Sequence, residues 1–415
     1  MSSSLRIAIR FLFAKRKSML MSLAGITFGV AFFIVTQAQT SGFEGFFVKT
    51  ILGTNGALRV RERIQDTLRS MSVDDQESGG FQISHKEGKR YVGDVAQPEL
   101  VADAIRQFGN VSGVSKVVTG NGQLVLRGQT RPAQIYGIVL DDHLGVSDLD
   151  EQIVFGELSD FRKTANGVLL SRYLADRLDV GLDEKIVLKV AGKSRKLTVS
   201  AIYETGVRDI DKVRMFIHLR TARSVLGKAF GASFLQVSLF DNNRAPQDAR
   251  RMIDVTQHHV SEWQRREKVW LDVFKILRIS SALTVSVIIL ISGLGMFSVL
   301  AIIVMEKTKE IAILRSMGFQ RRDISHIFLW QGFVITTAGT LSGWMLGFLM
   351  TLGLANLPIR IRGIFSTDHF VVNWSISHYL MAALIAFFVV MLASYFPARR
   401  AARLEPADVI RGTSG

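Results

Sequence analysis

The chain has 415 residues, 48% of them hydrophobic, a formal net charge of +15 and no cysteine. The lack of cysteine excludes disulfides, zinc–thiolate centres and cysteine nucleophiles. The basic excess does not indicate nucleic acid, because residues 41–275 carry 34 basic and 30 acidic residues and most of the surplus lies beside long apolar runs.

The N-terminal region predicts an amphipathic helix followed by a first membrane span. Residues 1–17 place Arg6 and Arg10 on one helical face among apolar residues, which is typical of an elbow helix lying in the headgroup plane. A simple topogenic tail is the alternative. The apolar run 18–38 predicts a transmembrane helix at 18–40, since about 20 residues rising about 1.5 Å each cross the hydrocarbon core. Its length and its poor cleavage site favour a retained anchor over a signal sequence.

Residues 41–275 predict a large α+β domain. Strand patterns occur at 133–140, 185–190, 196–203, 213–219 and 234–240, and helix patterns at 98–108, 171–180 and 219–227. The pair Asn121-Gly122 lies between β-rich arms and predicts a hairpin turn. Residues 62–95 are polar and weakly patterned, so we expect a loop there.

The end of this domain predicts one long helix. Residues 248–281 contain no Pro or Gly and predict a continuous helix running into the second span; the alternative is a separate surface helix that breaks near Ser280. His258 and His259 would then point in different directions on that helix. We therefore expect a solvated helix face rather than a metal site.

Signals for nucleotide or metal chemistry are weak. Gly-Lys-Ser at 192–194 ends like a phosphate-binding loop, but Val187 stands where glycine is required and a strand pattern follows instead of a helix. The acidic residues between positions 141 and 151 lack the spacing of an EF-hand. We expect no catalytic residue, no metal site and no cofactor bound by this chain.

Three more spans and two loops complete the predicted layout. We expect transmembrane helices at 276–305, 324–354 and 377–397, a cytoplasmic coupling loop or helix at 306–323, an outer loop at 355–376 and a cytoplasmic tail at 398–415. The apolar core of each span lacks charged residues, which argues against proton- or ion-coupled transport. Basic residues cluster near the N-terminus, in the coupling loop and in the tail, so the positive-inside rule places all three in the cytoplasm. The predicted fold is an α-helical membrane protein with four transmembrane helices and a large α+β extracytoplasmic domain inserted between helices 1 and 2.

Two glycine patterns mark predicted helix contacts. Gly25 and Gly29 form a GxxxG pair in the first span, and Gly339, Gly343 and Gly347 recur every four residues in the third. Small residues on one face let helix backbones approach closely in lipid. We expect tight packing within the chain or across a dimer; incidental membrane glycines are the alternative for the first pair.

The charged stretch MEKTKEIAILRSMGFQRRDI, residues 305–324, lies between two apolar runs. Ile311, Ala312, Leu314 and Arg315 occupy neighbouring helical positions and are expected to enter a groove of a partner protein. Gly318 is expected to end the helix. The predicted coupling residues are Glu306, Lys307, Thr308, Lys309, Glu310, Ile311, Leu314, Arg315 and Gly318. A basic loop needed only for topology is the alternative, but topology requires neither the acidic residues nor the Ile/Leu face.

This stretch closely resembles the first cytoplasmic loop of FtsX-like permeases, as found in the LolC/LolE lipoprotein-releasing permeases and in MacB. Residues 11–34 are similar to the family's basic elbow and Gly-Ile-x-x-Gly first span, and 41–47 to the Gly-Phe start of the LolC/LolE outer segment. Residues 395–412 resemble the family's closing Pro-Ala-x-x-Ala-Ala-x-x-x-Pro tail. Residues 171–188 and 202–211 are more loosely LolC/LolE-like.

The resemblance implies the permease subunit of an ABC transporter in the bacterial inner membrane. Such a subunit works in a pair, as a homodimer or heterodimer, with a separate cytoplasmic ATPase dimer that binds ATP and Mg. It would drive its periplasmic domain to extract or release lipoproteins or lipids. The alternatives are a MacB-like efflux permease with a periplasmic adaptor, or an FtsX-like mechanotransmitter that controls a cell-wall hydrolase.

The resemblance also bears on the carrier and the cargo. LolC-type permeases carry an extended, Pro-containing hook that recruits a lipoprotein carrier, whereas residues 191–196 predict a tight turn at the corresponding place. Acyl chains are expected to contact the outer ends of the first two spans. The candidates are Phe43, Phe46, Phe47, Phe274 and Ile276. Ordinary interfacial aromatic residues are the alternative.

Overall fold

The computed structural model describes residues 3–14, 16–62, 94–357, 361–362, 366–367 and 370–404. The chain divides into two units. Unit 1 comprises Met1–Gly45, Trp270–Ile359 and Asp368–Gly415, and unit 2 comprises Phe46–Val269 and Arg360–Thr367. Apart from residues 62, 94 and 95, the predicted loop 62–95 lies outside the described residues.

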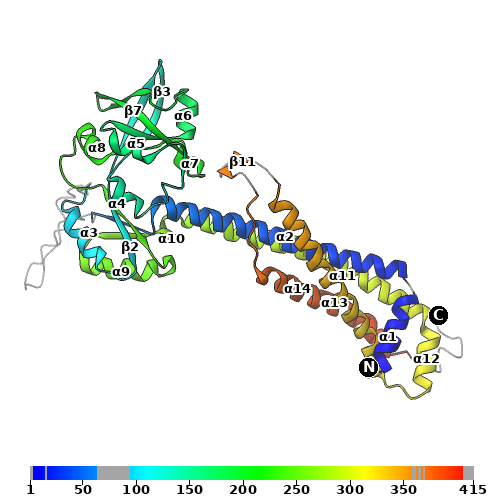
Figure 1. Cartoon of the computed structure of the whole chain (residues 1–415). Helices are drawn as coiled ribbons and strands as arrows, with labels where there is room; N and C mark the ends of the chain where they lie inside the picture. The colour runs from blue at the N-terminus through cyan, green and yellow to red at the C-terminus, as the bar shows by residue number, and fades with distance from the viewer. Residues whose placement is uncertain are drawn as a thin grey trace, which may run out of the picture. The chain divides into compact units, whose positions relative to one another are not determined.

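Unit 1 is built from long apolar helices (Figure 1). The helices are α1 (Ser3–Ala14), α2 (Arg16–Asn55, which ends in unit 2), α11 (Lys268–Glu306), α12 (Thr308–Ser316), α13 (Arg321–Ala355) and α14 (Ile376–Ala402). Within the described residues, α2, α11, α13 and α14 are long and apolar enough to cross a membrane. Their outward side chains are apolar as well, with Leu283 64% and Phe388 68% exposed. Helices that are apolar all round are typical of membrane spans.

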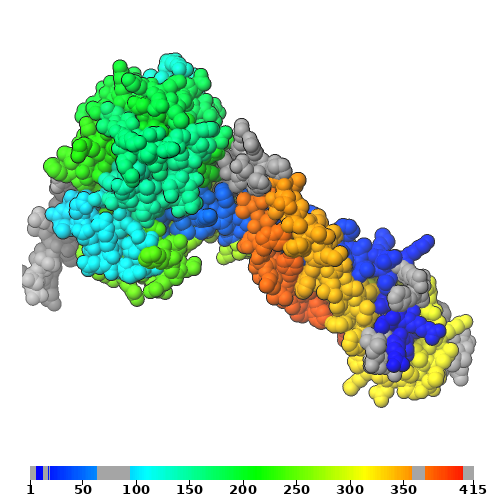
Figure 2. Space-filling model, viewed as in Figure 1, coloured from blue at the N-terminus to red at the C-terminus, as the bar shows by residue number. Residues whose placement is uncertain are grey.

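The core of unit 1 joins all six helices. Helices α13 and α14 lie side by side in both views (Figures 1 and 2), and α1 packs on α13. The side chains of Ala8, Phe11 and Leu12 from α1 belong to the same buried cluster as Ile311 and Ile324. The N-terminal helix is therefore part of the bundle.

Unit 2 is an α+β domain around one ten-stranded sheet. The strands are β1 (Leu58–Arg61), β2 (Val111–Leu126), β3 (Gln129–Ile138), β4 (Ile153–Gly156), β5 (Gly167–Ser171), β6 (Lys185–Val190), β7 (Lys193–Tyr203), β8 (Arg214–His218), β9 (Phe234–Leu239) and β10 (His259–Glu262). Their order is β10-β1-β9-β2-β3-β8-β5-β7-β4, and β6 pairs with β2 and β7. The pairs β3–β8 and β5–β7 are parallel, and the other pairs are antiparallel. A two-stranded hairpin, β11 (Ile361–Arg362) and β12 (Ser366–Thr367), stands apart from this sheet.

Short helices connect and cover these strands. They are α3 (Pro98–Arg106), α4 (Leu140–Leu144), α5 (Leu158–Lys163), α6 (Arg172–Leu178), α7 (Arg208–Asp211), α8 (Leu219–Leu226), α9 (Ala245–Thr256) and α10 (Trp263–Arg266), with the 3₁₀ turn η1 (Asn242–Arg244). The five strands and three helices predicted from patterns in this domain are confirmed, within a few residues at their ends.

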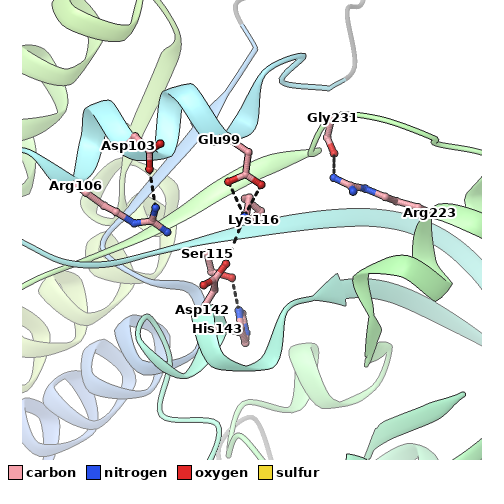
Figure 3. Close-up of polar contacts among 9 residues, drawn as sticks. All are labelled: Glu99, Asp103, Arg106, Ser115, Lys116, Asp142, His143, Arg223 and Gly231. Atoms are coloured by element: carbon pink, nitrogen blue, oxygen red, sulfur yellow. Dashed lines mark hydrogen bonds and ion pairs between the residues drawn. The ribbon is translucent and has the colours of Figure 1, made fainter. Parts of the chain in front are cut away.

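Polar contacts fix two of these helices to the long strand β2 (Figure 3). The Lys116 ammonium on β2 lies 2.7 Å from a Glu99 oxygen on α3 and 3.6 Å from an Asp142 oxygen on α4. On the neighbouring position of the strand, the Ser115 hydroxyl lies 3.2 Å from Nδ1 of the buried His143. Both residues thus contact α4, and Lys116 also contacts α3.

The predicted hairpin at Asn121-Gly122 is wrong. Both residues lie inside β2, and the turn to β3 is formed by Arg127 and Gly128, whose φ angles are 48° and 83°. Two consecutive positive φ angles are typical of a type I′ hairpin turn. Gly122 serves close packing instead, because a Cβ there would lie 2.9 Å from a methyl carbon of Val190.

The predicted continuous helix over 248–281 is also wrong. Helix α9 ends at Thr256, Gln257 takes a φ of 57°, and β10 pairs with β1 before α11 begins. His259 therefore lies in a strand rather than on a helix face. Strand pairing with a segment 200 residues earlier in the chain overrides the local pattern. The alternative break near Ser280 is absent, since α11 runs unbroken through that position.

The predicted tight turn near 191–196 is confirmed. Ala191 and Gly192 alone connect β6 to β7, with φ angles of 45° and 81°. The connection is a two-residue hairpin turn.

Candidate functional site

Helix α12 is a short, well-terminated helix between two long ones. It begins after Lys307, whose ammonium pairs with the Glu310 carboxylate one turn later. Its end is a Schellman motif, in which the N–H of Gly318 bonds the Arg315 carbonyl and the N–H of Phe319 bonds the Leu314 carbonyl. Gly318 has a φ of 99°, a conformation that L side chains rarely adopt. The helix ends at the glycine that the sequence indicated.

Two residues of the predicted docking face of α12 are buried in unit 1. Ile311 and Ala312 are each only 1% exposed, and Ile311 belongs to the core of unit 1. The Lys307 ammonium, just before α12, lies over the ring of Phe11 on α1, 5.8 Å from the ring centroid. Ile311 and Ala312 therefore lie on the inward face of α12.

The outward face of α12 carries different residues. Lys309 and Glu310 are exposed, Ile313 is 56% exposed and Met317 is 73% exposed. Spacings of three and four residues place these side chains on one stripe. Figure 2 shows α12, in yellow, at the surface of unit 1 beside the blue α1. Sequence reasoning missed Ile313 and Met317, although their i, i+4 spacing was a signal available in the stretch.

The predicted packing glycines lie at close helix contacts within unit 1. A Cβ at Gly339 would lie 2.8 Å from Ile26 Cγ2 on α2, and a Cβ at Gly343 would lie 2.7 Å from Val30 Cβ on the same helix. A Cβ at Gly347 would lie 3.1 Å from Ile34 Cδ1. On α2, a Cβ at Gly25 would lie 2.9 Å from Ser292 Oγ, and one at Gly29 would lie 2.9 Å from Ile289 Cγ1. Gly339, Gly343 and Gly347 of α13 thus face α2, and Gly25 and Gly29 of α2 face α11.

The candidate acyl-contact residues differ in exposure. Phe47 is 1% and Phe274 5% exposed, Phe46 is half-buried, and Ile276 is 63% exposed. Phe43 packs edge-on against Phe370 with ring centroids 5.4 Å apart. Only Ile276 of this set presents most of its side chain at the surface.

A polar contact that the sequence did not reveal joins α2 and α11 within unit 1. The Glu44 carboxylate on α2 pairs with the Arg278 guanidinium on α11. Two turns earlier on α2, the Gln37 amide donates a 3.1 Å hydrogen bond to the hydroxyl of Ser281, which lies about one turn from Arg278 on α11. These contacts join α2 and α11 at the ends of their apolar runs. Sequence reasoning missed the ion pair because its two members stand 234 positions apart.

Family comparisons agree with this architecture. The model of the MacB-like periplasmic core domain matches residues 19–255, more than half of the chain, and the model of the FtsX-like permease C-terminal region matches residues 282–406. The chain belongs to the FtsX-like, MacB-type permeases of ABC transporters. The resemblance stated from the sequence is confirmed.

Relatives of this FtsX-like permease include lipoprotein-releasing proteins. It is 23% identical to the lipoprotein-releasing system transmembrane protein LolC of Xylella fastidiosa (strain 9a5c), with 98% of each chain covered. A 132-residue segment is 34% identical to the macrolide export ATP-binding/permease protein MacB of Pasteurella multocida, covering 31% of this chain and 18% of that protein. The crystal structure of the periplasmic region of MacB from Actinobacillus actinomycetemcomitans covers 54% of this chain and 94% of its own, with 11% identity and a TM-score of 0.36.

The permease offers no metal-binding cluster in the part of the chain that the structure describes. Within those residues, no group of three or more His, Asp or Glu side chains is arranged to hold an ion. His258, singled out in the sequence, instead lies 3.6 Å from the Glu62 carboxylate.

Proposed function

We propose that this permease works with a separate cytoplasmic ATPase to extract or release lipoproteins or lipids from the bacterial inner membrane. The supporting observation is its similarity to LolC over 98% of both chains, which spans the helices and the inserted domain together. A similarity confined to the helices would support only a generic permease. ATP and Mg would belong to the ATPase, and both chain termini would lie in the cytoplasm with unit 2 in the periplasm.

The exposed stripe of α12 is the proposed contact with the ATPase. Ile313 and Met317 supply apolar area, and Lys309 and Glu310 supply charges of both signs at its edge. An amphipathic helix recognised in a groove uses anchors at this spacing. Two of the other predicted coupling residues act from within: Ile311 fixes α12 to the shared core of unit 1, and the Gly318 motif sets where α12 ends.

Force applied to α12 has a continuous route through unit 1. The buried side of α12 shares one apolar core with α1 and α13, so displacing α12 displaces its neighbours. Helix α11 runs without a break from Lys268 to Glu306, and α2 runs from Arg16 to Asn55. Both helices lead directly into the sequence of unit 2, so we propose them as the rods that transmit the motion.

The glycine contacts are proposed to keep these rods close together. The stripe on α13 is occupied by α2 of the same chain. A second permease, identical or homologous, would then bind through another surface of the bundle.

Cargo acyl chains are proposed to contact the outer ends of α2 and α11. Ile276 is accessible in the described state, whereas Phe47 and Phe274 are buried and become available only if their surroundings move. The pair Glu44–Arg278 ties the two helices together next to this place. Opening that pair would be part of admitting a chain.

Carrier recruitment is proposed to depend on the partner permease. The Ala191–Gly192 turn is too short to form an extended hook.

A second candidate function, efflux with a periplasmic adaptor, is favoured by the 34% identity of one segment to MacB.

Mass spectrometry of the native complex separates these functions. Affinity purification of the full chain from its own membranes is expected to retain an ABC ATPase, a permease partner and lipidated proteins. A photo-crosslinker at position 276 should form adducts with lipoproteins. Recovery of an adaptor with no lipoprotein would favour efflux, and recovery of a cell-wall hydrolase would favour mechanotransmission.

A further inference from the structure

Unit 2 contains a pocket of about 490 Å³ whose lining is strongly basic. Its charged lining consists of Arg59, Arg61, Arg214, Arg265 and Arg266 with a single carboxylate, Glu267. The volume falls within the usual range for a small-molecule site. The excess of cations over anions is the feature that requires an explanation.

The fold brings these arginines together from separate parts of the chain. Strand β1 has the sequence Leu-Arg-Val-Arg, so Leu58 and Val60 point into the core at 0% exposure while Arg59 and Arg61 share the opposite face. On β10 their register partners are Ser261 and His259, which also line the pocket. Helix α10 and strand β8 supply the other arginines. The strand β1 leads on from the end of α2, and α10 directly precedes α11.

The most buried of these cations has no carboxylate partner among the described residues. Arg214 is 5% exposed, and its Nη2 donates to Asn55 Oδ1 at 2.9 Å and to the Tyr136 hydroxyl at 3.2 Å. Among the described residues, its Nε and Nη1 have no hydrogen-bond acceptor, and neither has Arg59 Nε. Buried charges ordinarily have a counter-charge or a full set of hydrogen bonds.

Contacts within the protein stabilise the arginines only in part. The guanidinium of Arg214 lies 4.2 Å from the ring centroid of Tyr136. The guanidinium of Arg59 lies 4.3 Å from the ring centroid of Phe234. Arg266 donates to the carbonyl of Gly56 at 2.7 Å. Aromatic faces and carbonyls are neutral, so they leave the net positive charge of the pocket in place.

The ionisation of neighbouring groups reflects that charge. Burial and the nearby Arg59 cation lower the pKa of Arg266 to about 9. Burial alone would raise the pKa of Tyr136, but the surrounding Arg214, Arg59 and Arg61 cations outweigh it and the pKa is lowered. Both shifts have the sign expected where an anion is missing.

We infer that this pocket binds a phosphate-bearing anion. Several guanidinium groups around one cavity match the geometry of phosphate oxygens through paired N–H donors. The pocket is larger than a single carboxylate group needs, and its five arginines suit an anion that carries more than one negative charge. The phosphate belongs either to a phospholipid headgroup or to a soluble phosphate compound. The inference goes beyond the proposed cargo and does not depend on it.

Isothermal titration of the full chain tests this site. The protein is held in dodecyl maltoside, a detergent without phosphate, and titrated separately with inorganic pyrophosphate and with dihexanoyl phosphatidylglycerol below its micelle concentration. Dihexanoylglycerol, which lacks the phosphate, is the control ligand. Saturable binding of a phosphate probe, with none of dihexanoylglycerol, is expected. Tighter binding of the phospholipid identifies a headgroup as the source, and tighter binding of pyrophosphate identifies a soluble compound.

Paired variants separate a site from general attraction to a basic protein. R61Q/R265Q removes two exposed arginines of the pocket and is expected to weaken binding at least tenfold, since charge-assisted hydrogen bonds are lost. R250Q/R251Q removes two exposed arginines of α9 outside the pocket lining and is expected to stay within twofold of the wild type. The inference is overturned if neither phosphate probe binds, if both double variants weaken binding equally, or if R61Q/R265Q binds as the wild type does.

Discussion

Replacing Gly343 with alanine puts a methyl group into the contact between α13 and α2. The new Cβ would lie 2.7 Å from Val30 Cβ, 2.8 Å from Val30 Cγ1 and 3.0 Å from the carbonyl oxygen of Thr27. Carbon atoms in contact normally stay about 3.5–4.0 Å apart, so the helices must separate by roughly 1 Å at this level. Overpacking of this kind costs about 1–3 kcal/mol. Alanine gains up to ~1 kcal/mol over glycine in a helix, which leaves a net loss of about 0–2 kcal/mol relative to the wild type.

Gly353 provides the matched control on the same helix. A Cβ at Gly353 meets nothing within 4 Å, so G353A should keep the helix gain and lose no packing. Unfolding of the full chain in a mild detergent, followed by tryptophan fluorescence during titration with dodecyl sulfate, compares the two. G343A should unfold at a lower dodecyl sulfate fraction than the wild type and G353A at the same or a higher fraction. Equal stability of G343A and G353A would refute the assigned contact.

Three other predictions concern α12 and unit 2. I313E places a charge in the centre of the exposed stripe of α12 and should reduce co-purification of the ATPase at least tenfold without changing the unfolding transition, as judged by quantitative mass spectrometry. G318A should cost about 1–2 kcal/mol because of its φ of 99°, and faster hydrogen exchange at the end of α12 would show this. Burial and the Arg214 cation lower the pKa of His143 to about 3, so the unfolded state takes up a proton below about pH 6.5 while the folded state does not. The free energy of unfolding should therefore fall by ~1.4 kcal/mol per pH unit from pH 6.5 toward 3, and H143Q should lack this slope. Burial raises the pKa of Asp211 to about 6, so this carboxyl group makes the free energy of unfolding rise as the pH falls from about 6 to 3.8. The wild type and H143Q share this contribution, so it cancels in the difference between their free energies of unfolding. Equal slopes for the two proteins would contradict the assignment.

The elements with strong local patterns could be predicted from the sequence. Four long uncharged runs gave four apolar helices, and alternation gave strands such as β6 and β9. The end of α12 followed from Gly318 alone, because a Schellman motif needs a residue with positive φ. These features depend on neighbours within a few residues, so one stretch of sequence contains the whole signal.

The errors arose where a distant segment decided the outcome. Gly122 has the chemistry of a turn, but Val190 approaches it and the turn forms five residues later. His259 joins a strand because β1 is available to pair with it. Ile311 is buried because it belongs to a core that five other helices also form. In each case the deciding contact is tertiary, and local propensity is only a weak guide there.

The basic pocket also escaped prediction. The Leu-Arg-Val-Arg alternation of β1 is the pattern of a strand with one charged face, but four residues are too few to predict a strand from alternation. The arginines of β8 and α10 join that face only through the fold. Two positions 155 residues apart, Arg59 and Arg214, have no sequence pattern in common.

We propose that a separate ATPase drives this permease through the outward face of α12. The most direct measurement is photo-crosslinking in native membranes with a benzophenone amino acid placed at position 313 or, as the buried counterpart, at position 311. An adduct between position 313 and an ABC ATPase that changes in yield with ATP, together with little or none from position 311, is the predicted result. The absence of any ATPase adduct from position 313, or equal adducts from both positions, would contradict the account.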